Sequence, residues 1–293
     1  MNNAGDQSRR DAQAAIAAFS EAARLNLNDP YRDGCVLRMP GYGQVVMTGD
    51  LHGHTRNLEK LQKYAMLDRA QARHVVLHEL IHADLEKPTD IDHSHDLLLR
   101  AARYKCSFPD QVHFLQSNHE LAQLTGYLIA KNGRVVIREF NAAVEAAYGA
   151  SAGGDVLAAI NEFIASFPLA VRTENRIWLS HSLPNVYDMD EFDPGVFARP
   201  LSREELHTNR TVFTLVWGRR HTSEHIEALA GELDVDVFII GHQPQESGFA
   251  VLFDRLIILA SNHNHGTFLP IDLSKPHTAA DLVANIRKFV EVA

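Results

Sequence analysis

Five short apolar segments of the sequence each end in side chains that bind metal ions or transfer protons. The endings are GDLHGH, HELIH, SNHE, LSHS and IIGHQ, and the candidate ligands in them are Asp50, His52, Glu79, Asn118, His181 and His242. Taken singly, a His or Asp after a strand is most often a cap or a solvated loop residue. Two divalent ions about 3.5 to 4 Å apart, however, need roughly seven nitrogen and oxygen donors, one of them a carboxylate able to bridge. Since the five endings together supply this set, we predict a centre of two metal ions.

The elements that must position these ligands alternate between strand and helix patterns. Segments 44–50 and 73–80 are Val-rich apolar runs, and NLEKLQKYAML between them has helical periodicity, which predicts a β-α-β unit. The strand pattern recurs after this unit, at 112–120, 175–182, 235–243, 255–262 and 266–273, and residues 121–167 are mostly helical. Open α/β sheets place their sites at the carboxyl ends of strands, where all five endings fall. The predicted fold class is α/β, with two mixed β-sheets packed as a sandwich and helices on both outer faces.

Composition and charge set limits on organisation and partners. The 293 residues are 45% apolar, enough for a large core, and we predict a helical N-terminal extension over residues 1–40 followed by one domain over residues 41–293. A net charge of -9 argues against nucleic acid as a partner, because nucleic-acid binding depends on clustered Lys and Arg. Only Cys35 and Cys106 are present, and no run of about 18 apolar residues occurs. We therefore expect a soluble, cytoplasmic protein that binds no membrane, and the sequence leaves its oligomeric state open.

The order of the motifs is similar to that in a known family. GDLHG, SNHE, His181 and the GH of IIGHQ resemble the signature of the calcineurin-like metallophosphoesterases, and FIASFPLAV and RIWLSHSLP resemble the middle region of their Ser/Thr protein phosphatase group. The resemblance covers about residues 43–272. It implies the metallophosphoesterase fold and two Mn, Fe or Zn ions. The implied ligands are Asp50 and His52 for the first ion, and Asn118, His181 and His242 for the second.

The same resemblance implies a reaction and a substrate. A hydroxide held by the metal ions attacks phosphorus, and His119 matches the family's general acid, which protonates the leaving alkoxide. Glu120 is expected to orient or neighbour this site, although a solvated carboxylate at a helix start explains it equally well. The implied function is hydrolysis of phosphate monoesters, above all phosphoserine or phosphothreonine in a phosphoprotein, with a small phosphorylated molecule as the other possible partner.

The chain departs from the family's second motif, GDxxDRG, where it has HELIHAD at residues 78–84. Glu79 takes the place of the bridging Asp, and His82 takes the place of the Asp that partners the catalytic His. Ala83 and Gln116 replace two arginines that clamp phosphate, and such charge-assisted contacts are typically worth about 1.5 to 3 kcal/mol each. The candidates for replacement contacts to phosphate are Arg219, Arg220, His78 and His82.

Three other functions remain open at this point. HELIH is a literal HExxH, which on a helix binds zinc through two histidines one turn apart and would make the chain a metallopeptidase. A hydrolase of dinucleotide polyphosphates or other small molecules would use the same two metal ions. Because both clamping arginines are missing, a vestigial domain that binds metal without turnover also fits. The metallopeptidase hypothesis leaves the other four endings without a role, so we expect the phosphoesterase.

Overall fold

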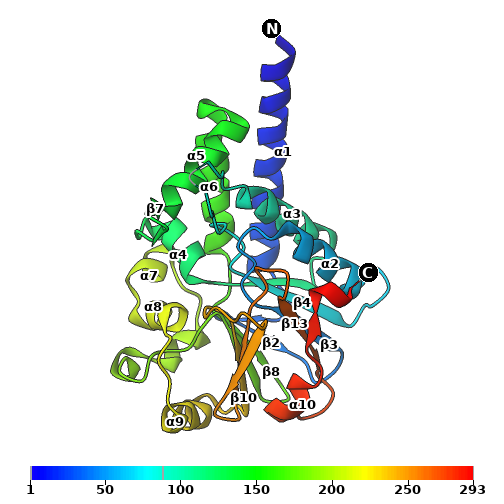
Figure 1. Cartoon of the computed structure of the whole chain (residues 1–293), viewed down its shortest axis with the longest axis vertical. Helices are drawn as coiled ribbons and strands as arrows, with labels where there is room; N and C mark the ends of the chain where they lie inside the picture. Colours follow the sequence, from blue (N-terminus) through cyan, green and yellow to red (C-terminus); the bar gives the residue numbers. More distant parts are fainter. Residues whose placement is uncertain (1, 88, 293) are drawn as a thin grey trace.

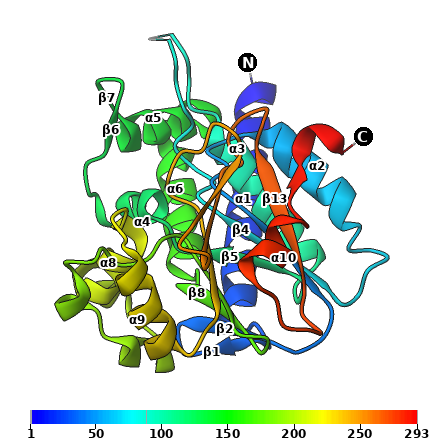
Figure 2. The same cartoon turned by 60° about the horizontal axis from the view of Figure 1, so that its bottom comes forward.

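The fold is built on two β-sheets that lie face to face (Figures 1 and 2). The computed structural model describes residues 2–87 and 89–292. In the smaller sheet the strand order is β14-β13-β3-β4-β5; β3, β4 and β5 are parallel, and β13 is antiparallel to β3. Its strands are β3 (Gln44–Thr48), β4 (Arg73–His78), β5 (Val112–Leu115), β13 (Thr267–Asp272) and β14 (Arg287–Lys288).

The larger sheet is also mixed, with strand order β1-β2-β8-β9-β10-β12-β11. Parallel pairing joins β9 to β10 and β10 to β12, whereas β8 and β9 are antiparallel. Its strands are β1 (Arg32–Asp33), β2 (Val36–Met39), β8 (Ala170–Thr173), β9 (Ile177–Ser180), β10 (Val237–Ile240), β11 (Phe249–Leu252) and β12 (Leu256–Leu259). A separate hairpin is formed by β6 (Ala130–Lys131) and β7 (Arg134–Val135). Strands β1 and β2 lie within the extension predicted as helical over residues 1–40, so that segment also contributes to the larger sheet.

Helices cover the outer faces of both sheets. One hydrophobic cluster joins the smaller sheet to α1 (Asn2–Leu27), α2 (Thr55–Ala65), α3 (Ser94–Ser107), α5 (Val136–Tyr148) and α6 (Ala150–Ala165). A second cluster joins the larger sheet to α4 (Asn118–Thr125), α7 (Arg203–Thr208), α8 (Arg210–Trp217) and α9 (Ser223–Leu233). The remaining helices are α10 (Ala279–Val283) and the 3-10 turns η1 (Met189–Glu191), η2 (Pro194–Ala198) and η3 (Phe289–Glu291). The predicted fold class is confirmed.

The Val-rich strands of the smaller sheet are apolar on both faces because both faces are covered. In β3, Val45 and Met47 point between the sheets, while Val46 points to the helical side. Leu179 of β9 and Ile239 of β10 meet them from the larger sheet in the same cluster. This alternation is the period-2 geometry of a strand, and it explains a continuous apolar run in place of an amphipathic one.

The N-terminal helix shares the core with the helices beside it. The periodicity predicts a helix over residues 8–26, and α1 is longer by about two turns at its start. Ala12, Ala15, Phe19 and Ala22 are buried on one face, and the ring of Phe19 lies 5.7 Å from that of Phe163 in α6. Across the described part of the chain, no helix combines the length and the hydropathy that crossing a membrane requires.

A buried ionic cluster fixes the end of α1 against the sheet. Lys105 of α3 is fully buried, and its Nζ lies 2.9 Å from Oδ2 of Asp29, which also accepts from Nδ1 of His113 at 2.9 Å. His74 of β4 follows, with Nδ1 3.2 Å from Nε2 of His113. Buried ion pairs are costly to break, because the remaining charge loses its compensation in a medium of low polarity.

Lys105→Met is therefore expected to lower the free energy of unfolding by about 3 kcal/mol, since it leaves the buried Asp29 carboxylate with only neutral donors. The control is Arg203→Met, which removes an exposed ion pair with Glu162 and should cost less than about 1 kcal/mol. Urea denaturation measures the free energy of unfolding of both variants. Equal losses of stability would contradict a special role for the buried Lys105–Asp29 pair.

Candidate metal centre

The strand endings singled out in the sequence meet at one end of the two sheets. Asp50 and His52 follow β3, Glu79 follows β4, Asn118 begins α4 after β5, His181 follows β9, and His242 follows β10. The two sheets are joined at this point, because the backbone of Asp50 forms an isolated β-bridge with Ala260, just after β12. The six predicted ligands thus lie in one region, four from the smaller sheet and two from the larger.

Left-handed backbone conformations occur in the loops that carry these side chains. His52, Glu79, His82 and His242 all have left-handed backbone angles, with φ of 40°, 48°, 59° and 66°. Such a conformation costs a non-glycine residue of order 1 kcal/mol or more and persists only where the surroundings impose it. Here the left-handed backbone turns the four side chains toward the same region.

One group of donor atoms is centred on His181. Its Nε2 lies 2.7 Å from Oδ1 of Asn118, 2.9 Å from Nδ1 of His242 and 3.6 Å from Oε1 of Glu79. Oε1 of Glu79 is buried and has no hydrogen-bond partner among the described residues. Nε2 of His242 accepts from Arg219, so Nδ1 of His242 carries that ring's proton, which faces Nε2 of His181. The lone pairs of Asn118, His181 and Glu79 still outnumber this proton, which favours a cation, and imidazole, amide and carboxylate are all ligands of transition metals.

The second group of donor atoms lies on the other side of Glu79. Nε2 of His52 is 3.5 Å from Oε2 of Glu79, and Nδ1 of His52 donates to the carbonyl oxygen of Ile81 at 3.0 Å, which leaves Nε2 unprotonated. The two oxygens of Glu79 thus face different histidines, as a bridging carboxylate would. Asp50 lies beside them and accepts from the backbone N–H of His242 at 2.9 and 3.0 Å.

Electrostatics also favour bound cations. Burial and the neighbouring carboxylate of Asp50 raise the pKa of Glu79 well above its ordinary value. Two carboxylates this close cannot both ionise without compensation, and divalent ions would supply it. The residues present therefore fit a pair of metal ions.

His119 and His82 form a pair at the edge of the candidate centre. Their Nδ1 atoms lie 2.9 Å apart, and Nε2 of His82 lies 3.1 Å from Oε1 of Gln123. Nε2 of His119 is 3.9 Å from Oε1 of Glu79. Burial, followed by the nearby His52 and Lys131, lowers the pKa of His119 well below its usual range, so the free protein holds this imidazole neutral.

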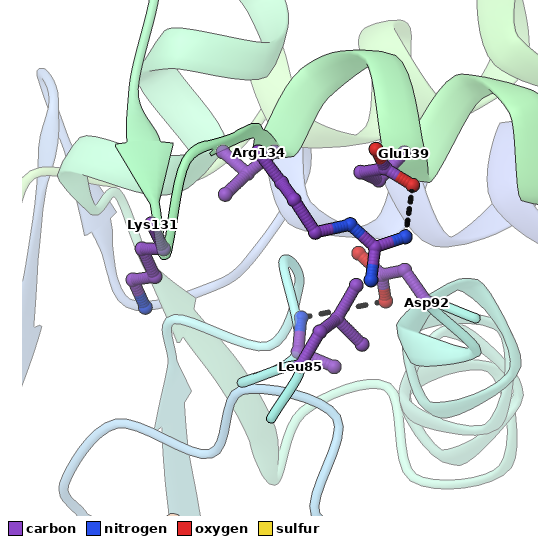
Figure 3. A pocket seen from close by; sticks show the side chains of 7 residues that line it. Leu85, Asp92, Lys131, Arg134 and Glu139 are labelled. Atoms are coloured by element: carbon purple, nitrogen blue, oxygen red, sulfur yellow. Dashed lines mark hydrogen bonds and ion pairs between the residues drawn. The ribbon is translucent and has the colours of Figure 1, made fainter. Parts of the chain in front are cut away.

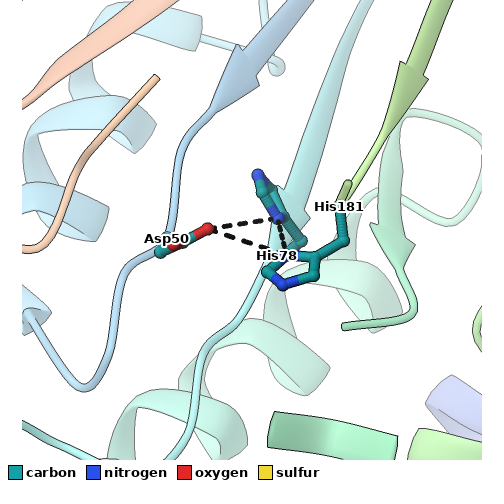
Figure 4. Close-up of side chains that lie close together, drawn as sticks. All are labelled: Asp50, His78 and His181. Carbon is teal, nitrogen blue, oxygen red and sulfur yellow. Dashed lines mark hydrogen bonds and ion pairs between the residues drawn. The ribbon is translucent and has the colours of Figure 1, made fainter. Parts of the chain in front are cut away.

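Two of the predicted site residues, His78 and Glu120, are buried away from the pocket above the donor atoms. His78 is fully buried, with Nε2 bonded to the carbonyl oxygen of Thr48 and Nδ1 3.0 Å from Nδ1 of His181 and 3.6 Å from Oδ1 of Asp50, and it lies outside the pocket wall (Figure 4). Glu120 is also fully buried and accepts from the backbone N–H groups of Leu80 and Ile81, where it supports the loop instead of facing a reaction. Burial raises the pKa of Glu120 to about 7.

Of the two adjacent arginines, one reaches the pocket. Arg219 lines it, and its Nε donates to Nε2 of His242 at 2.9 Å. Arg220 is exposed and is not part of the pocket wall. Asn185 holds both residues by accepting from their backbone N–H groups at 2.7 and 2.9 Å.

Lys131 is a pocket residue that the sequence analysis missed. It projects from the β6-β7 hairpin, with Nζ 3.3 Å from Nε2 of His52 and 3.0 Å from Oδ1 of Asp84. The hairpin is fixed to the loop below it, because Asn132 donates to the carbonyl of Leu85 and Arg134 to that of Asp90, at 3.1 and 3.0 Å. Figure 3 shows Lys131 and Arg134 leaving this hairpin above Leu85 and Asp92. The Asn-Gly pair at 132–133 is a hairpin signal that places a Lys just before a turn.

The comparisons with known proteins agree with this geometry. The family model for calcineurin-like phosphoesterases matches residues 43–246, and the chain belongs to this family, whose members depend on two metal ions. It is accordingly a metal-dependent phosphoric ester hydrolase. No curated protein matches the chain.

Solved structures share the fold at low sequence identity. A protein serine/threonine phosphatase from Saccharomyces cerevisiae, described as similar to human phosphatase PP5, has a TM-score of 0.63 and 12% identity, over 94% of this chain and 88% of that one. A cold-active protein-tyrosine phosphatase from a psychrophilic Shewanella species has a TM-score of 0.56 and 16% identity, over 81% and 77%.

The HExxH alternative does not agree with the structure. His78 is the last residue of β4, and Glu79 and His82 follow in left-handed conformations, so HELIH forms no helix. The two histidines contact different partners, His181 and His119, and they belong to no common group of donor atoms among the described residues.

Gly241 sets a steric limit at the centre. A Cβ at this position would lie 2.2 Å from Oδ1 of Asp50 and 2.4 Å from Cε1 of His78. Gly241→Ala is therefore expected to displace Asp50 and to weaken Mn²⁺ binding about 10- to 100-fold, the usual effect of disturbing groups that position ligands. Isothermal titration of the metal-free protein measures this affinity.

The control is Gly231→Ala, because nothing lies within 4 Å of a Cβ at that helical position in α9. This variant should bind Mn²⁺ as the unchanged protein does and gain about 0.5 to 1 kcal/mol of stability. Unchanged Mn²⁺ affinity in Gly241→Ala would show that Asp50 is not a ligand.

Proposed function

We propose that this protein hydrolyses phosphate monoesters, with phosphoserine or phosphothreonine in a polypeptide as the substrate. The observation that carries the proposal is the position of Glu79, whose two oxygens face donor sets on either side, below a pocket with a cationic side chain at each flank. When bound, two divalent ions at these donor sets supply Lewis-acid activation of water and of the phosphoryl group. Manganese, iron and zinc all suit this ligand mixture.

Lys131 and Arg219 are the proposed phosphate-binding cations. Lys131 stands beside His52, and Arg219 stands beside His242, so the two cations lie next to the opposite donor sets. They take over the charge lost at Ala83 and Gln116. An ammonium and a guanidinium from two different loops can hold separate oxygens of one phosphate group, which orients it for in-line attack.

His119 is the proposed proton donor. Its Nδ1 is engaged by His82, so only Nε2 faces the pocket, which is the geometry needed to pass a proton to a leaving alkoxide. The imidazole is neutral in the free protein, and a bound phosphate dianion favours its protonated form, because an opposite charge within a few ångströms raises the pKa of a histidine.

A polypeptide substrate is supported by an aromatic groove beside the pocket. The groove lies between α4 and α8 and is lined by Leu121, Tyr127, Phe213 and Trp217, among others. The ring of Trp217 lies 6.3 Å from that of His242, so one wall of the groove contacts a candidate metal ligand. Tyr127 is half exposed and packs against Trp217 at 5.3 Å. A small phosphorylated molecule would fill the pocket and leave this groove empty.

Metal-free protein resupplied with Mn²⁺ is expected to hydrolyse an aryl phosphate, and Glu79→Ala and His119→Ala should each lose at least about 100-fold in kcat. The control is His93→Ala, an exposed loop histidine outside the pocket. Phosphopeptides should exceed dinucleotide polyphosphates in kcat/KM. Two bound equivalents of metal without turnover on any of these substrates would instead support a domain that has lost its reaction.

Lys131→Met and Arg219→Met are each expected to lower kcat/KM for a phosphomonoester about 10- to 100-fold, and to weaken inhibition by inorganic phosphate similarly, because each removes one charge-assisted contact. Steady-state kinetics with inhibition by phosphate measures both. Arg220→Met is the matched control, since this neighbour is exposed and outside the pocket wall. Equal losses in Arg219→Met and Arg220→Met would rule out a specific clamp.

A further inference from the structure

The two histidines of the HELIH loop (residues 78–82) have the same hydrogen-bonding arrangement. Each uses Nδ1 to meet Nδ1 of another histidine, at 3.0 Å for His78 with His181 and 2.9 Å for His82 with His119. Each also uses Nε2 to meet an oxygen, the carbonyl of Thr48 at 2.9 Å and Oε1 of Gln123 at 3.1 Å. Both loop histidines are fully buried.

The pair at His78 determines where its protons lie. A backbone carbonyl only accepts, so Nε2 of His78 must carry the proton shared with Thr48. Its Nδ1 is then a lone pair, and it accepts from Nδ1–H of His181. Nε2 of His181 is consequently unprotonated, and it is this atom that faces Asn118 and His242.

The pair at His82 follows the same logic through a side-chain amide. Nε2 of Gln123 donates to Oδ1 of Asn141 at 2.8 Å, which turns Oε1 of Gln123 toward His82. His82 therefore donates from Nε2, accepts at Nδ1 from His119, and leaves Nε2 of His119 free to face the pocket.

We propose that His78 and His82 are positioning residues that fix His181 and His119 in the tautomer with a free Nε2, the first for metal binding and the second for proton transfer. This inference rests on the proposed function for the role of His119. The supports are neutral imidazoles, so they orient the functional histidines without adding a negative charge beside the buried carboxylates of Asp50 and Glu79.

The loop that carries His78 and His82 is hydrogen-bonded on both sides. Backbone N–H groups of Leu51 and His52 donate to the carbonyl oxygen of Glu79 at 2.9 and 2.8 Å, and Glu120 accepts from the backbone of Leu80 at 2.7 Å. Because this backbone cannot shift freely, the two histidines keep a fixed position behind their partners.

The test replaces His78 and His82, one at a time, by leucine and by asparagine. Leucine keeps bulk and removes the acceptor, whereas the Oδ1 of asparagine stands near the place of the imidazole Nδ1 and accepts the same proton. We expect His78→Leu to weaken binding of one of two Mn²⁺ equivalents about 10- to 100-fold and His78→Asn to restore it within a few-fold. His82→Leu should lower kcat at least tenfold with both metal equivalents retained, and His82→Asn should recover most of it.

A direct readout of the tautomers makes the proposal independent of activity. In metal-free protein labelled with ¹⁵N-histidine, His181 and His119 should show an unprotonated Nε2, and His78→Leu should produce a mixture of tautomers at His181. The control is the pair of His74 with His113, which lies away from the centre. His74→Leu should change stability without changing metal affinity.

The outcomes separate the two proposals. The positioning role would be overturned if the leucine and asparagine variants lost Mn²⁺ affinity (at His78) or kcat (at His82) equally. A protonated Nε2 on His181 in the unchanged protein would also overturn it. The expected tautomers and metal affinities without phosphatase activity would leave that role standing for His181 and reject the proposed function.

Discussion

The structure depends on two neighbouring carboxylates, Asp50 and Glu79, whose burial and mutual repulsion raise the pKa of Glu79. Asp50 and Glu79 lie at the junction of two sheets, and Nε2 of His181 and Oδ1 of Asn118 present lone pairs beside Glu79. A cluster of acceptors is unstable by itself, and cations make it stable. The chain brings such acceptors together by three means. These are the left-handed backbone angles of the loops, the absence of a Cβ at Gly241, and the buried histidines His78 and His82 behind their partners.

The positions of the strand endings were predictable from the sequence because two independent patterns coincide. Apolar runs such as QVVMT identify strands that are covered on both faces, and the polar residues after them must emerge at the carboxyl ends of those strands. The order of the endings then identifies the family. The six candidate ligands converge as expected, although their identity as ligands stays a prediction until metal is bound.

The details that escaped prediction depend on side-chain direction and on contacts distant in sequence. His78 is the last residue of β4, whereas Glu79 has a left-handed backbone, and this turn sends one side chain below the centre and the other into it. Glu120 is adjacent to His119, yet it turns back to the loop of β4. Lys131 lies 79 residues from His52 in sequence, and only the packing of the β6-β7 hairpin brings the two together.

The junction between the sheets has a consequence for the folding of the whole chain. The smaller sheet supplies Asp50 and Glu79, whereas the larger supplies His181 and His242, the last of these 192 residues from Asp50. Ions shared between these groups act as a reversible cross-link that closes most of the polypeptide into a loop, and their binding free energy adds to that of folding. Metal supply then governs how long a molecule survives as well as whether it reacts, because without the ions nothing but side-chain packing and hydrogen bonds holds the two halves together at this point.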